Sequence, residues 1–224
     1  MITETSAAEM LLDESDIWHS VLPEALTLLE KVMNKKDKDP LVKILEVGLV
    51  NALFSYRVLV EDYNILSQYV SIVNDKKTID IYEIQRDIRR FFLSADSVLD
   101  IVDKILFKIN KYIEKNPEAA LASTPIKHSR VNCKSHKEIN SIRNEAIHEG
   151  VPSVFFNETR NTEMISHSNV AASVTDNYIT IDLFVGDKEN RVRYNLNGKI
   201  GITFMDVEDY VKEVLKKIDN HLLQ

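Results

Sequence analysis

With 224 residues, of which 44% are hydrophobic and only five are glycine and five proline, the chain holds enough apolar material for a sizeable core with few turns. The net charge of −7 excludes a protein that coats nucleic acid over its whole surface, and the single cysteine, Cys133, excludes an internal disulfide framework. We expect a cytoplasmic protein without membrane contact, because the sequence has neither a secretory leader nor a run of about 18 apolar residues. One mostly helical domain with an appendage is the simplest organisation.

The first part of the chain predicts a short helix, a linker and a long helix. We expect residues 1–20 to form a mobile end and a short helix that carries Trp18. Proline is favoured in the first turn of a helix, so a helix is predicted from Pro23 to about Lys35. A charged linker, Lys35–Pro40, precedes the strongly apolar and proline-free stretch Leu41–Val73. This stretch predicts one long helix that is apolar on more than one side and lies at the centre of a bundle.

A second long helix is predicted after the polar turn at residues 74–77. Asp80 and Glu83 suit its first turn, and Asn116-Pro117 ends it. Apolar residues recur along it in alternating steps of four and three, which is the periodicity of a helix in an antiparallel bundle. They are Ile84, Ile88, Phe91, Ala95, Val98, Val102, Ile105, Ile109 and Tyr112.

The opposite side of this second helix carries Ser97, Asp100 and Lys104. A solvent-exposed ion pair between Asp100 and Lys104, four residues apart, explains two of the three. Alternatively, Ser97 and Asp100 line a second buried surface, either behind the helix that follows or at a dimer contact.

A shorter helix is predicted from His136 to about Glu149. Ser135 and Glu138 have the spacing of a capping box, in which both side chains bind free backbone amides at the start of a helix. Gly150, followed by a proline two residues later, favours a stop at this point.

Three polar residues in the last turns of this shorter helix form the candidate catalytic site. Asn144 and His148 are four residues apart and share one face, and Arg143 lies on the adjoining edge. An imidazole moves protons near neutral pH, and a guanidinium binds a phosphate through paired hydrogen bonds. Phosphodiester chemistry on RNA needs these two groups. The alternative is that His148 is a cation at a helix C-terminus and Arg143 belongs to a surface ion pair.

The segment that leads into this helix is basic. Between residues 127 and 143, Glu138 is the single acid among five lysines and arginines. Such a segment suits the approach of a phosphate backbone, with an ordinary solvated loop as the alternative. The residues predicted to bind substrate are Lys127, Arg130, Lys134 and Lys137.

The C-terminal part predicts a small β-structure and a last helix. Residues 153–176, rich in Ser, Thr and Asn, predict a loop. Clean alternation predicts a strand over Tyr178–Val185, and the hairpin signal Asn197-Gly198 joins two shorter strands into an antiparallel meander. Asp206 then caps a final amphipathic helix. The two shorter strands are Arg191–Leu196 and Lys199–Phe204.

Motifs for other chemistry are scarce. The sequence has no Gly-rich phosphate loop, no Gly-x-Ser-x-Gly elbow and no His-Glu-x-x-His helix. His128, Cys133 and His136 are candidate zinc ligands, but no fourth ligand has the spacing of a zinc site. We therefore expect neither a metal nor a cofactor.

The sequence Arg143-Asn-Glu-Ala-Ile-His148, late in a helix that follows two long bundle helices, resembles the Arg-x(4–6)-His motif of HEPN domains. The resemblance covers residues 41–150, and Ser97-Val-Leu-Asp100 is similar to the family's other polar position. The C-terminal part resembles the extension of larger bacterial HEPN proteins. The expected fold is mainly α: an antiparallel HEPN-like helical bundle over residues 1–152, with a small C-terminal antiparallel β-meander and a final helix, residues 153–224, packed on the same domain.

The HEPN resemblance implies a metal-independent endoribonuclease, a toxin or an antiviral defence effector, with an active site that forms across a homodimer. Attack on RNA by its own 2′-hydroxyl needs a base and an acid, and the motif of one chain offers one imidazole, so two chains would supply two. On this interpretation His148 moves protons, Arg143 stabilises the charged phosphorane, and Asn144 orients the phosphate or His148. The expected partners are RNA, a second copy of the chain, and an antitoxin or another protein of a defence system.

Two other classes of function stay open. The first is a non-catalytic HEPN-like module that binds RNA or a nucleotide, for which His148 would not affect any rate. The second is a structural helical partner protein, in which Arg143, Asn144 and His148 would be buried or ion-paired within the chain.

Overall fold

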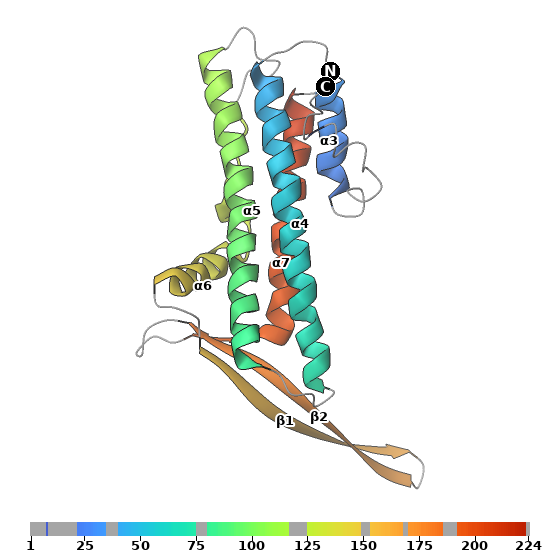
Figure 1. The fold of residues 1–224 in the computed structure, drawn as a ribbon. Coiled ribbons are helices and arrows are strands. Elements are labelled where there is room, and N and C mark those ends of the chain that lie inside the picture. The colour runs from blue at the N-terminus through green and yellow to red at the C-terminus, as the bar shows by residue number, and fades with distance from the viewer. Residues whose placement is uncertain are drawn as a thin grey trace, which may run out of the picture.

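Helices α3, α4, α5 and α7 run alongside one another in an elongated bundle, and α6 projects from the side of α5 (Figure 1). The computed structural model describes Ala8 and residues 22–34, 40–74, 80–116, 125–148, 153–167, 170–185 and 192–222. The helices are α3 (Pro23–Met33), α4 (Pro40–Asn74), α5 (Ile81–Lys115), α6 (His136–His148), α7 (Leu196–Leu222) and the short 3-10 helix η1 (Arg130–Asn132). The strands are β1 (Ser153–His167), β2 (Val170–Val185) and β3 (Val192–Asn195).

The two predicted long helices are confirmed as the antiparallel pair α4 and α5. Contacts between them join residues in reverse order: Tyr69 binds Asp87 at 2.8 Å and Ser94 binds Asp62 at 2.6 Å. Asp80 caps α5 by accepting a hydrogen bond from the backbone amide of Tyr82 at 2.8 Å, and the helix ends before Asn116, as predicted. Local capping chemistry thus fixed both ends of α5.

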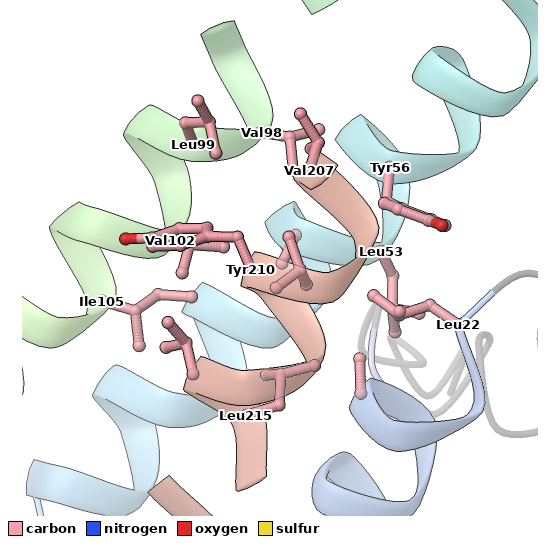
Figure 2. Packing of buried hydrophobic residues seen from close by; sticks show 14 of the residues in the cluster. Leu22, Leu53, Tyr56, Val98, Leu99, Val102, Ile105, Val207, Tyr210 and Leu215 are labelled. Carbon is pink, nitrogen blue, oxygen red and sulfur yellow. The ribbon is translucent and has the colours of Figure 1, made fainter. Parts of the chain in front are cut away.

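The predicted apolar stripe of α5 forms the centre of the core. Its residues from Ile84 to Ile109 are buried, and Tyr112 is half-buried. Helix α7 lies against α4 and α5, and Figure 2 shows Val207, Tyr210 and Leu215 of α7 among residues from both helices. Helix α3 runs parallel to α7, because Lys31 pairs with Asp219 at 2.7 Å near one end while the other end of α3 approaches the middle of α7. The expected helix carrying Trp18, and residues 35–39 of the expected linker, lie outside the described residues.

The predicted fold class is wrong at the C-terminal end of the chain. Residues Lys199–Phe204, predicted as the last strand of a meander, belong to α7, which therefore begins ten residues before the expected cap at Asp206. Residues Ser153–His167, predicted as a loop, form β1 and pair antiparallel with β2 from Ser153↔Phe184 to His167↔Val170. The described residues form a mainly helical bundle with a long two-stranded ribbon, to whose base the short β3 adds (Figure 1).

Packing against α4 explains why residues 199–204 are helical. Ile200, Thr203 and Val207 recur at helical spacing and are buried, which extends the stripe of α7 toward its N-terminus. Phe204 stacks on Tyr63 of α4 with ring centroids 4.4 Å apart. The contacts of this segment with α4 therefore outweigh the local preference of Asn197-Gly198 for a hairpin turn.

In the described ranges, none of the helices combines the length and the apolar character needed to cross a bilayer.

Candidate functional site

A segment that we call the strap, residues 125–135, lies against α5 and leads into the start of α6. Asn110 of α5 holds the backbone of Ile126 at both polar groups: the amide of Ile126 donates to Asn110 Oδ1 at 2.8 Å, and Asn110 Nδ2 donates to the Ile126 carbonyl at 3.0 Å. The amide of Arg130 donates to Asp103 Oδ1 at 3.1 Å. Side chains of α5 thus satisfy backbone groups of the strap, which has no regular hydrogen-bond ladder of its own at these points.

The end of the strap binds α7 and sets the start of α6. Cys133 is buried, and its thiol donates to the backbone carbonyl of Asp206 at 3.6 Å. Ser135 donates its hydroxyl proton to Asp206 Oδ2 at 2.5 Å, and Glu138 binds Lys199 at 3.3 Å. Helix α6 begins at His136 as predicted, but the two side chains predicted to form its capping box both bind α7.

Arg130 of the strap binds a row of carboxylates on α5. Its guanidinium lies 3.4 Å from Asp96, 3.1 Å from Asp100 and 3.4 Å from Asp103. Asp103 also accepts a hydrogen bond from the hydroxyl of Tyr210 at 2.6 Å. Because one planar guanidinium spans three acids, Arg130 fixes the strap along α5.

Arg143 of α6 reaches the same row of carboxylates. Its Nε lies 3.1 Å from Asp96 Oδ2, and its Nη1 donates to Asn144 Oδ1 at 3.2 Å. The side chain of Asp96 is 11% exposed, whereas that of Arg143 remains 39% exposed. One largely buried carboxylate therefore lies between two arginines, with Arg130 on one oxygen and Arg143 on the other.

The predicted site residues fall into separate groups in the structure. Arg143 and Asn144 lie together on α6, while His148 is the last residue of that helix and its side chain lies outside the described part. Ser97 is exposed, and Asp100 forms the predicted ion pair with Lys104 at 3.1 Å. Of the residues predicted to bind substrate, Arg130 binds α5, and the exposed ones are Lys127, Lys134 and Lys137.

Two residues of the site were missed by sequence reasoning, Asp96 and Asp103. Together with Asp100 they place acids at positions i, i+4 and i+7 of α5, a row along one face beside the apolar stripe. Acids at the border of a buried stripe require partners, so this row could have predicted that cationic side chains of a neighbouring segment pack against α5.

The candidate zinc ligands make separate contacts. Cys133 faces the Asp206 carbonyl, and burial, as the largest cause, raises the pKa of its thiol to about 11. His128 binds Lys217 at 3.0 Å. Within the part of the chain that the structure describes, no group of three His, Cys, Asp or Glu side chains is arranged to hold a metal ion.

The described side chains offer the oriented and partly exposed guanidinium of Arg143, the amide of Asn144 beside it, and exposed lysines at positions 134 and 137. The likeness to HEPN domains stays a prediction from the motif Arg143–His148 and its position in a bundle. Comparisons with protein-family models, with curated proteins and with solved structures find no match to this chain.

Proposed function

We propose that the chain is a metal-independent endoribonuclease of HEPN type, a toxin or antiviral defence effector, that cleaves RNA through attack by the 2′-hydroxyl. The observation that carries the proposal is the accessible guanidinium of Arg143. It is held at 3.1 Å by Asp96 and at 3.2 Å by Asn144, yet keeps 39% of its side chain exposed.

Holding Arg143 in advance favours phosphate binding. A long side chain that is already ordered loses little conformational freedom when a ligand binds, and a guanidinium pairs well with phosphate oxygens. In the transition state of RNA cleavage the phosphorane carries extra negative charge, which a fixed cation stabilises. Asp96 acts in this scheme as the group that orients Arg143.

The exposed face of α6 supports contact with a polynucleotide. Lys137, Asn140, Ser141 and Asn144 are exposed, and their spacing places them along one side of the helix. Lys134, just before α6, is also exposed. A cation with uncharged donors and acceptors along one helix suits a single-stranded or looped RNA, whose phosphates and base edges are both accessible.

His148, at the end of α6, is assigned the proton transfers in this proposal. One chain contributes one such imidazole, so we propose a two-fold homodimer in which both His148 residues lie near the axis and share the roles of base and acid. RNA is the substrate, and an antitoxin or another defence-system protein is the expected regulator.

A non-catalytic RNA- or nucleotide-binding module is the second candidate, and a structural role is the third. The binding module is favoured by the same Arg143, Asn144 and lysines, because binding RNA or a nucleotide does not require a proton-transfer group. The structural role is favoured by the ion pair of Arg143 with Asp96 inside the chain.

The test is cleavage of single-stranded and looped RNA by the purified full chain with a chelator present. We expect 2′,3′-cyclic phosphate ends, detected by mass spectrometry, and no cleavage of DNA. His148→Ala should lower the rate about 100-fold or more, because it removes the proton-transfer group. Arg143→Ala should weaken both binding and rate, whereas His221→Ala, which removes an exposed histidine of α7, should leave both unchanged.

The outcomes separate the three candidates. A parent protein that binds RNA and never cuts it, with His148→Ala binding equally well, would establish the binding module. Absence of RNA binding together with a large drop in melting temperature for Arg143→Ala would establish the structural role.

A further inference from the structure

The strap is fastened to α7 through His128, a residue that the proposed reaction does not use. The imidazole of His128 stacks on the ring of Tyr210 with centroids 5.0 Å apart and an interplanar angle of 18°. Its Nδ1 lies 3.0 Å from Nζ of Lys217. Its Nε2 is buried and has no hydrogen-bond partner among the residues that the structure describes.

The partner of Nδ1 determines the protonation state of the ring. A lysine ammonium has only hydrogens to offer, so Nδ1 must be the acceptor and the ring must be neutral with its proton on Nε2. A second proton could enter only at Nδ1. There it would remove the acceptor and place two positive groups against each other at the present separation of 3.0 Å.

We propose that the contact between His128 and Lys217 is an acid-sensitive latch, which fastens the strap to α7 while the imidazole is neutral and releases the strap when it is protonated.

The charged groups around His128 come from both helices that it faces. Burial, and after it the ammonium of Lys217 on α7, lower the pKa of His128 from its ordinary value of 6.5, whereas Glu213 of α7 and Asp103 of α5 act in the opposite direction. Glu213 itself pairs with Lys217 at 2.9 Å, and this pair offers Lys217 an alternative partner once His128 is charged. Tyr210 stays neutral, because burial and its hydrogen bond to Asp103 raise its pKa.

The direction of the pH effect follows from the lowered pKa. An unfolded or released strap takes up the proton near the ordinary value of 6.5, before the docked strap does. The stability that docking contributes is therefore fully present above that value and is lost as the pH falls below it toward the lowered pKa.

The latch connects to the candidate site through the strap. Two residues beyond His128, Arg130 binds Asp96, and Asp96 holds Arg143. Release of His128 would therefore loosen one of the two cations that share the Asp96 carboxylate. The proposal concerns docking of the strap and does not depend on whether the chain cleaves RNA.

Hydrogen exchange at single backbone amides tests the latch. The amides of Ile126 and Arg130 donate to Asn110 and Asp103 of α5, so their protection from exchange reports whether the strap is docked. Between about pH 8 and pH 5 we expect their protection factors, corrected for intrinsic exchange, to fall about tenfold. The amide of Tyr82, which donates to Asp80 at the far end of α5, is the matched control and should not change.

Variants identify the group responsible. His128→Asn keeps an acceptor near the position of Nδ1 but cannot be protonated in this range, so protection of the strap should become independent of pH. His221→Asn should keep the response of the parent. A response that persists in His128→Asn, or protection of Ile126 and Arg130 that is constant in the parent, would overturn the proposal.

A titration of the parent protein decides the matter even if His128→Asn fails to fold. The imidazole nitrogen shifts of His128, followed by NMR, should show the Nε2-protonated neutral ring and a pKa below the ordinary value of 6.5. Lys217→Met should move the titration of His128 to higher pH. A ring protonated at Nδ1 in its neutral form, or a pKa unaffected by Lys217→Met, would contradict the latch.

Discussion

Gly48 of α4 lies directly against Ile105 of α5, so closely that a Cβ atom at position 48 would come within 2.6 Å of Ile105 Cγ1. The absence of a side chain at Gly48 is therefore what allows the two long helices to approach at this level. Ile105 is a buried member of the predicted stripe and is branched at Cβ, so it has few rotamers with which to move aside.

Gly48→Ala is expected to destabilise the protein, although alanine favours helices. The gain in helix propensity is about 1 kcal/mol, while overpacking of a core contact costs about 1–3 kcal/mol. Urea unfolding should show a net loss for Gly48→Ala and a larger loss for Gly48→Val. Gly198→Ala is the matched control: among the described residues, no atom beyond the chain neighbours and the backbone of α7 lies within 4 Å of a Cβ at this position, so the change should be neutral or stabilising.

A double-mutant cycle locates the cause. Ile105→Ala removes the atom that a Cβ at position 48 would meet, at a cost of about 2–5 kcal/mol by itself. Gly48→Ala should then cost less in the Ile105→Ala background than in the parent. Equal costs in both backgrounds would show that the close approach is not the reason for glycine.

Asp96→Asn is expected to weaken both the fold and the candidate site. The change keeps the shape of the side chain but leaves Arg130 and Arg143 without the carboxylate that they share. We expect a loss of about 1–3 kcal/mol in the free energy of unfolding, because the carboxylate is largely buried and its hydrogen bonds to the two arginines are charge-assisted. On the proposed function, binding of RNA should weaken as well.

Asp100→Asn serves as the comparison for Asp96→Asn. Asp100 also binds Arg130, at 3.1 Å, but its side chain is 39% exposed. Solvent screening should keep its contribution to roughly 0–1 kcal/mol. Equal losses for the two variants would mean that burial of Asp96 does not distinguish it.

Cys133 should react very slowly with a thiol reagent in the folded protein. Its side chain is buried, and burial raises the pKa of the thiol to about 11, so the reactive thiolate is about 100-fold scarcer than for a thiol with the usual value. As the chain has one cysteine, the colour yield in a disulfide-exchange assay comes from this residue alone. Full reaction should appear only after unfolding in denaturant. Prompt reaction of the native protein would place Cys133 at the surface.

The contribution of Tyr69 to the stability of the fold should decrease at alkaline pH. Burial and then the hydrogen bond to Asp87, 2.8 Å long, raise the pKa of Tyr69 from 10.0 to about 12. The folded state therefore keeps the phenolic proton longer than the unfolded state does. Stability from this contact is complete below pH 10.0 and declines as the pH rises toward about 12.

The measurement for Tyr69 is the difference in unfolding free energy between the parent and Tyr69→Phe across this pH range. The difference should favour the parent below pH 10.0 and shrink above it. Tyr82, 78% exposed on α5, provides the control, since Tyr82→Phe should match the parent at every pH. A constant difference for Tyr69→Phe would contradict the raised pKa.

Local patterns were sufficient for the helices that form the bundle. Alternating apolar steps predicted α5, and Asp80 and Asn116 marked its ends, because capping groups bind backbone atoms only a few residues away. The stretch from Leu41 to Val73 predicted α4 within one residue at each end, and the start of α6 at His136 was also predicted. Such signals depend on neighbours in the sequence and are therefore readable without the fold.

The proximity of two candidate site residues was predicted for the same reason. Arg143 and Asn144 are adjacent on one helix, so their proximity follows from the sequence. That Arg143 is oriented by Asp96, and that Asp96 is shared with Arg130, involves two separate segments packing on α5. No spacing rule gives the distance between side chains on different elements.

By itself, then, the sequence determined which stretches form the long helices and which residues α6 presents, because propensity, periodicity and capping act over a few residues. Only the tertiary structure decided that residues 199–204 join α7: stacking of Phe204 on Tyr63 and burial of Ile200 outweighed a local hairpin signal. It also decided the partners of Arg130, His128 and Arg143, since a polar group at the contact between two elements binds whichever charge, donor or acceptor the packing of those elements brings within reach.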